Sequence, residues 1–274
     1  MQRSLSILIP LALVAALAMT LPAAAQSDNA IEIISKSLEN RKVKNSIQTI
    51  SMTIEEVKRD GSVRSGKPRV MLSKIRDDED AMRSYIRFNA PSDMAGVQFV
   101  SVSPKKGETE QFMYFPPPDE LLTRISGSGR AGRFFGSDFA YEDMEISSVD
   151  DAVHSSAGEE TITIGKDTLN CWKIESVPKP EAKSSYSKIV SWIDKSNNVA
   201  RQVLFFDKKG RELKRMQVLQ VAKDGEFFIP IDTLMEGLQR TTRTKLHVDD
   251  YKTNVPDSEL PLEMFTEAYV KSQG

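Results

Sequence analysis

The residues of this 274-residue chain with the most familiar chemical roles are two histidines and one cysteine. His154, His247 and Cys171 do not stand at the spacing of a metal-binding motif. Cys171 lies between Leu169 and Trp172 in an expected strand, which favours an inert buried thiol over a nucleophile. Sequence distance alone leaves a cysteine–histidine pair open. We expect no metal and no cofactor.

A second group that could do chemistry is the acidic cluster Asp138, Glu142 and Asp143. Paired carboxylates are one interpretation. We favour another, in which Asp138 caps a short helix and the other two acids occupy its first turns, where the helix dipole favours negative charge. The sequence contains no G-x-S-x-G motif. The chain is therefore predicted not to be an enzyme, and an unrecognised hydrolase is a distant alternative.

Residues 127–132 match the dinucleotide-binding pattern G-x-G-x-x-G, with Asp150 near the position of the ribose-binding acid. The match lacks its context, because no buried strand precedes it and Gly136 interrupts the segment after it. A flexible glycine hinge explains the segment better. The remaining alternative is an anion site, in which backbone amides near Arg130 and Arg133 bind the anion.

Composition excludes other classes of function. The formal net charge is −2, so a broad basic surface for nucleic acid is not expected. No run of basic residues is present for anionic lipid heads. A hydrophobic content of 39% is enough for a folded core, and the single cysteine means that no internal disulfide forms.

The amino terminus has the pattern of a secretory signal peptide. Arg3 is followed by an apolar run and by three alanines at 23–25. We predict cleavage after Ala25, leaving residues 26–274 as a single domain that does not span the membrane; an uncleaved anchor is the alternative. No cysteine directly follows the apolar run, so the chain is not expected to be a lipoprotein itself.

The remaining chain first shows helical and then strand periodicity. Asn29 is expected to cap a helix whose apolar face is formed by Ile31, Ile34 and Leu38. Alternating apolar and polar residues from position 47 onward predict about eleven antiparallel strands joined by short turns. Twelve segments are candidates for these strands, namely residues 47–55, 70–75, 82–88, 96–103, 111–115, 161–164, 169–177, 186–193, 199–206, 213–222, 227–235 and 238–248.

One face of such a sheet needs an apolar cover. We expect the amino-terminal helix and a lid formed by residues 116–144 to provide it, since the lid is too apolar for a solvated linker. The predicted apolar cleft and lid consist of Ile50, Met52, Ile54, Met82, Ile86, Phe88, Phe134, Phe135, Phe139, Tyr141 and Met144. For any one of them a plain core role is the alternative.

Three blocks carry a resemblance to a known family: residues 85–96 (YIRFNAPSDMAG), residues 112–116 (FMYFP) and residues 136–144 (GSDFAYEDM). They resemble the bacterial outer membrane lipoprotein-sorting proteins of the LolA/LolB-like superfamily. Residues 186–194 and 205–210 continue the resemblance, but a triple proline at 116–118 stands where the family often has Leu-Pro.

This resemblance implies an unclosed antiparallel β half-barrel with helices over its concave apolar face. It also implies a periplasmic carrier of lipid or lipoprotein acyl chains between the inner and outer membranes, with an inner-membrane RND-type transporter as partner. We expect cargo to displace the lid from the sheet. The alternative from another class is a periplasmic sensor or adaptor that binds a protein partner on the same sheet.

Overall fold

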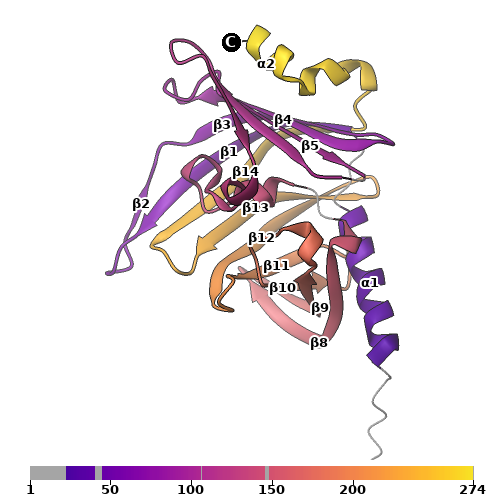
Figure 1. Cartoon of the computed structure of the whole chain (residues 1–274). Coiled ribbons are helices and arrows are strands. Elements are labelled where there is room, and N and C mark those ends of the chain that lie inside the picture. The colour runs from indigo at the N-terminus through magenta and orange to yellow at the C-terminus, as the bar shows by residue number, and fades with distance from the viewer. Residues whose placement is uncertain (1–22, 41–44, 106, 146–147, 274) are drawn as a thin grey trace, which may run out of the picture.

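The computed structural model describes residues 23–40, 45–105, 107–145 and 148–273 of the chain. It begins with helix α1 (Ala23–Glu39) and ends with the short helix α2 (Glu267–Ser272); a large sheet lies between them (Figure 1). Most of the predicted signal peptide falls outside the described residues, and its predicted cleavage point after Ala25 lies within α1.

The first half of the sheet is a meander in which each long strand pairs with the next. Its strands are β1 (Asn45–Val57), β3 (Arg69–Asp77), β4 (Ala81–Ala90), β5 (Gln98–Pro104), β6 (Glu110–Phe115) and β7 (Leu121–Ile125). The short strand β2 (Val63–Ser65) folds back on β1. All of these pairings are antiparallel, as expected for strands joined by short connections.

The second half is a longer meander. Its strands are β8 (Ala152–Ile164), β9 (Asp167–Pro178), β10 (Lys188–Asp194), β11 (Ala200–Phe206), β12 (Glu212–Asp224), β13 (Phe227–Gly237) and β14 (Thr242–Thr253). The two meanders join because β1 pairs with β14, the first strand with the last. This produces one antiparallel sheet of 14 strands whose two end strands, β7 and β8, are not paired with each other.

The predicted fold class, an open and mainly β half-barrel, is confirmed. Two strands were missing from the prediction. Strand β2 is only three residues long, and β7 falls inside the segment expected to be lid, directly after the prolines at 116–118. The lid therefore begins after Ile125 rather than at residue 116.

Helix α1 covers the inner face at one end of the sheet, as predicted. Ala30, Ile33 and Ile34 pack against Ile174 of β9 and Ile193 of β10. Two details of the predicted helix were wrong. Ile31 is 44% exposed and so is not part of the buried face, and Asn29 lies inside the helix rather than at its start.

The outer face of β4–β6 has its own cover, formed by residues 262–272. Met264, Phe265 and Val270 pack on Tyr85, Val100, Phe112 and Tyr114. Figure 1 shows α2 lying across this part of the sheet, on the side away from the lid. Residues 262–272 thus form a second apolar layer on the outer face. Within the described residues, no helix combines the length and apolar character needed to cross a membrane.

Candidate functional site

The lid, defined here as residues 127–144, packs on the inner face of the sheet. It consists of three short 3₁₀ turns, Gly127–Ala131, Phe134–Gly136 and Tyr141–Met144. Phe134, Phe139 and Tyr141 are buried, and Phe135 and Met144 are partly buried. They share one apolar cluster with residues from both halves of the sheet, among them Met52, Met71, Ile86, Phe88, Phe99, Val203, Phe205 and Met235.

Aromatic rings form the centre of this lid cluster. The ring of Phe135 lies edge-on to that of Phe88, with centroids 4.7 Å apart, and Phe134 lies edge-on to Phe99 at 5.2 Å. Phe135 adopts a left-handed backbone conformation, with φ of 45°. A bulky residue is costly there, so the surrounding contacts must hold it. The guanidinium of Arg69 on β3 donates to its carbonyl oxygen and provides part of that support.

A buried aspartate attaches the lid to β14. The Asp138 carboxylate accepts hydrogen bonds from the hydroxyls of Thr242 at 2.5 Å and Thr244 at 2.8 Å. The Asp138 backbone N–H donates to the Thr244 hydroxyl at 2.9 Å. Gly237 leaves room for this contact, since a Cβ there would lie 3.0 Å from the Asp138 carboxylate. The prediction that Asp138 caps a helix is wrong; its carboxylate binds a neighbouring strand.

A second carboxylate attaches the lid to β12, another strand of the same half of the sheet. Asp143 accepts the backbone N–H of Ala140 at 2.7 Å, so it is this residue that caps the last lid turn. It also pairs with the ammonium of Lys214 on β12 and accepts the Tyr186 hydroxyl at 2.6 Å. Burial, together with the nearby Asp143 carboxylate, raises the pKa of Tyr186 far above its usual range. The hydroxyl therefore stays protonated and donates.

Two further acids are engaged near the lid, Glu142 by the loop before β10 and Glu145 by the lid residue Arg130. Glu142 accepts hydrogen bonds from the backbone N–H of Ser185 at 2.9 Å and from the Ser185 hydroxyl. The Glu145 carboxylate accepts hydrogen bonds from two nitrogens of the Arg130 guanidinium, Nε and Nη2. Burial of Glu145 raises the pKa of its carboxyl. The acidic cluster is thus engaged in structural contacts, and the paired-carboxylate interpretation has no free pair of acids to support it.

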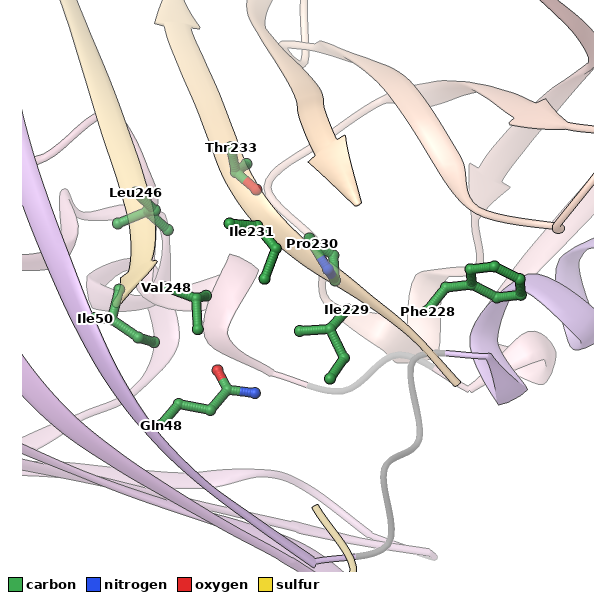
Figure 2. A pocket seen from close by; sticks show the side chains of 9 residues that line it. All are labelled: Gln48, Ile50, Phe228, Ile229, Pro230, Ile231, Thr233, Leu246 and Val248. Atoms are coloured by element: carbon green, nitrogen blue, oxygen red, sulfur yellow. The ribbon is translucent and has the colours of Figure 1, made fainter. Parts of the chain in front are cut away.

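Beside the lid, the middle of the inner face carries an open cleft of about 260 Å³. Its lining residues, shown in Figure 2, are Gln48, Ile50, Phe228, Ile229, Pro230, Ile231, Thr233, Leu246 and Val248. They come from β1, β13 and β14, the strands at which the two meanders meet. Ile50 and Leu246 also pack against the lid cluster, so the cleft adjoins that cluster, although its described lining residues all come from the strands.

The cysteine and the two histidines considered as reactive groups are each buried or hydrogen-bonded within the fold. Cys171 is fully buried on the outer face, and burial raises the pKa of its thiol to about 11, as expected for an inert cysteine. His154 is buried between the Ser176 hydroxyl and the Val149 carbonyl. His247 is exposed beside Asp232. The described part of the chain contains no cluster of three or more His, Cys, Asp or Glu that could hold a metal ion.

The glycine-rich segment is not in the setting that nucleotide binding requires. Gly127–Ala131 follows β7, which ends an antiparallel sheet, and forms a 3₁₀ turn in place of the helix of a βαβ unit. Arg130 is engaged by Glu145, and Arg133 donates to the Ser137 carbonyl and contacts Asp138. Both arginines of the alternative anion site are therefore used within the lid.

A comparison with protein families identifies the family to which this chain belongs. A family model described as "-like: Uncharacterized protein" matches residues 80–272. The chain belongs to this family. No curated protein matches the sequence.

Solved structures show that the fold is LolA-like. An outer membrane lipoprotein-sorting protein domain from Vibrio parahaemolyticus aligns with a TM-score of 0.79 and 24% identity, over 89% of this chain and 99% of that one. A DUF1329 family protein from Desulfovibrio piger aligns with a TM-score of 0.78 and 21% identity, over 89% and 99%. A LolA superfamily protein from Nitrosomonas europaea gives 0.63 and 20%, over 88% and 98%. The resemblance found in the sequence is confirmed.

Within this LolA-like fold, the predicted site residues divide into three groups. Nearly all of the lid and strand residues meet in the lid cluster, where they contact one another. Ile50 alone of the predicted set also lines the open cleft. Ile54 and Met82 belong neither to that cluster nor to the cleft lining.

Sequence reasoning missed most of the cleft. Ile229 and Ile231 on β13, and Leu246 and Val248 on β14, lie in segments that were predicted as strands but not as site. Their alternation with polar neighbours such as Lys245 and His247 is the signal that could have identified them. No sequence signal indicated the threonines of β14 that hold the lid.

Proposed function

We propose that this LolA-like protein is a periplasmic carrier that binds an acyl chain of a lipid or lipoprotein in the open cleft, with no chemistry of its own. The observation that carries the proposal is an open cleft on the inner face, beside the lid cluster, in which seven of the nine described lining residues are apolar. The lipoprotein-sorting domain of Vibrio parahaemolyticus, which shares the fold, supports it. The signal peptide predicted from the sequence, with cleavage expected after Ala25, supports the periplasmic location.

The size of the cleft limits the cargo. One methylene takes up about the volume of a water molecule in the liquid, roughly 30 Å³. A volume of about 260 Å³ then holds about nine methylenes, which is part of one acyl chain. At roughly 0.8 kcal/mol for each buried methylene, the gross gain is about 7 kcal/mol before the costs of association are subtracted. Such modest binding suits a carrier that must release its cargo.

The lid is the second part of the proposal. We infer that it stays in place beside the cleft, because displacing it would break the buried contacts of Asp138 and Asp143 and expose four aromatic rings. Exposing each large side chain costs roughly 1.5–3 kcal/mol. The displacement of the lid by cargo, expected from the sequence, stays a prediction that competes with this one. Transfer between the two membranes with an RND-type transporter as partner is also part of the proposal.

Filling the cleft tests the carrier function. In Val248→Trp a large ring occupies the open space, and a matched Val177→Trp adds the same ring at a valine of β9 that is 44% exposed. With a pyrene-labelled dodecanoic methyl ester as probe, we expect Val248→Trp to weaken binding at least about tenfold and Val177→Trp to leave it unchanged. Equal binding by both variants would contradict the cleft as the cargo site. A protein partner lost only in Val248→Trp, without any lipid binding, would favour the adaptor.

A further inference from the structure

One end of the cleft carries a row of neutral polar side chains. Gln48 on β1 lies opposite Ser73 of β3 on one side and Tyr251 of β14 on the other. Residues paired in this way across antiparallel strands share one face of the sheet and have Cβ atoms about 5 Å apart. The three residues therefore form a polar row on the inner face, next to the apolar row that contains Ile50 and Val248.

Gln48 is the member of this row that lines the cleft itself. In Figure 2 its carboxamide projects into the space between Val248 and Ile229. Among the described residues, the side chains of Gln48, Ser73 and Tyr251 make no hydrogen bond with one another or with any other group, although Ser73 is 95% buried. Gln48 and Tyr251 are partly buried, and Gln48 alone of the three lines the cleft. A carboxamide without a protein partner, placed among mainly apolar lining residues, is available to a ligand that has acceptors of its own.

The lining of the cleft indicates which chemical groups of a ligand can bind there. None of its described lining residues is charged. A phosphate or a free carboxylate would lose its hydration there without gaining a cation, which is costly. A neutral carbonyl would lose far less and would accept a hydrogen bond from the carboxamide N–H of Gln48.

We propose that Gln48, assisted by Ser73 and Tyr251, binds the ester or amide carbonyl at the head of an acyl chain whose methylenes lie along Ile50, Ile231 and Val248. This inference rests on the carrier function proposed above and adds the linkage that the site recognises. Such a carbonyl occurs both in glycerolipids and in acylated proteins, and both offer the same acceptor to Gln48.

A set of probes with one chain and different ends tests the inference. The pyrene-labelled dodecyl chain is prepared as methyl ester, N-methylamide, free carboxylate and plain hydrocarbon, and binding is measured by fluorescence titration. We expect the ester and the amide to bind about fivefold more tightly than the hydrocarbon, the effect of one hydrogen bond. The carboxylate should not share this gain.

The variant Gln48→Leu should remove the advantage of the ester over the hydrocarbon, and it should bind the hydrocarbon at least as tightly as the unmodified protein because leucine adds an apolar contact. Gln220→Leu is the matched control, because Gln220 is an exposed glutamine on β12 outside the cleft lining. If the preference for the ester persists in Gln48→Leu, the inference is wrong and the carrier function stands. If no probe binds the unmodified protein, both are wrong.

Competition separates the two sources of the carbonyl. Dioleoylglycerol represents glycerolipids, and a peptide with an N-palmitoylated terminus represents acylated proteins. Displacement of the ester probe by either compound, weakened in Gln48→Leu, supports the inference and names the source. Displacement by neither, with the ester probe itself bound, contradicts it.

Discussion

Asp143 of the lid and Lys214 of β12 form an ion pair that is almost completely withdrawn from solvent, with side chains 8% and 6% exposed. The ammonium of Lys214 also lies 5.1 Å from the ring centre of Tyr186 and 5.0 Å from that of Phe205. Removing one member of a buried pair is costly because it leaves an uncompensated charge. The lid and the second half of the sheet should therefore be energetically coupled.

Lys214→Met tests this coupling. We expect the free energy of unfolding in urea to fall by about 3 kcal/mol or more, because the Asp143 carboxylate remains buried without its cation. Lys183→Met is the control, since its ion pair with Glu108 is largely exposed and should contribute less than about 1 kcal/mol. The double variant Lys214→Met/Asp143→Asn should recover much of the loss. Equal effects of the two lysine variants would contradict the role of the pair.

Asp138 offers a test that distinguishes a cap from a strand attachment. A helix cap would tolerate Asp138→Ser, because serine is a good capping residue. Attachment to Thr242 and Thr244 requires the two oxygens of the carboxylate, which serine lacks. We expect Asp138→Ser and Asp138→Ala to lower the free energy of unfolding by similar amounts, about 2 kcal/mol, and Asp138→Asn by less. A neutral Asp138→Ser variant would contradict the attachment.

The fixed lid makes a prediction for amide hydrogen exchange. The backbone N–H of Phe134 donates to the Phe139 carbonyl at 2.8 Å, and that of Tyr141 donates to Gly132 at 3.1 Å. Both amides should be protected in the unliganded protein. Adding the ester probe should slow exchange in β13 and β14 and leave the lid unchanged. Rapid exchange in the lid that slows on binding would instead support the displaceable lid expected from the sequence.

The sequence predicted the sheet well because its signals are local. Alternation along residues such as Ile50 and Met52 specifies a strand and its apolar face without any knowledge of the partner strand. Apolar character likewise identified Phe134 and Phe139 as residues that must be covered. The GSDFAYEDM block indicated the family, because a short segment with several special residues is more specific than a strand.

The cleft could not be predicted in the same way. It exists because β1 pairs with β14, about two hundred residues later, so that Ile50 lies opposite Val248. No local pattern encodes that pairing. The role of Asp138 was misjudged for the same reason: capping is a local preference, whereas its actual partners, Thr242 and Thr244, lie over a hundred residues away.

Native mass spectrometry of the protein purified from its own periplasm tests the central claim most directly. We predict a bound mass that fragments to an acyl-containing molecule, present in the unmodified protein and in Val177→Trp and absent in Val248→Trp. Val248→Trp must first be shown to fold, by an unchanged circular dichroism spectrum. The same bound mass in Val248→Trp, or a stoichiometric protein partner without any lipid, would contradict a carrier that holds its cargo in the cleft between β1, β13 and β14.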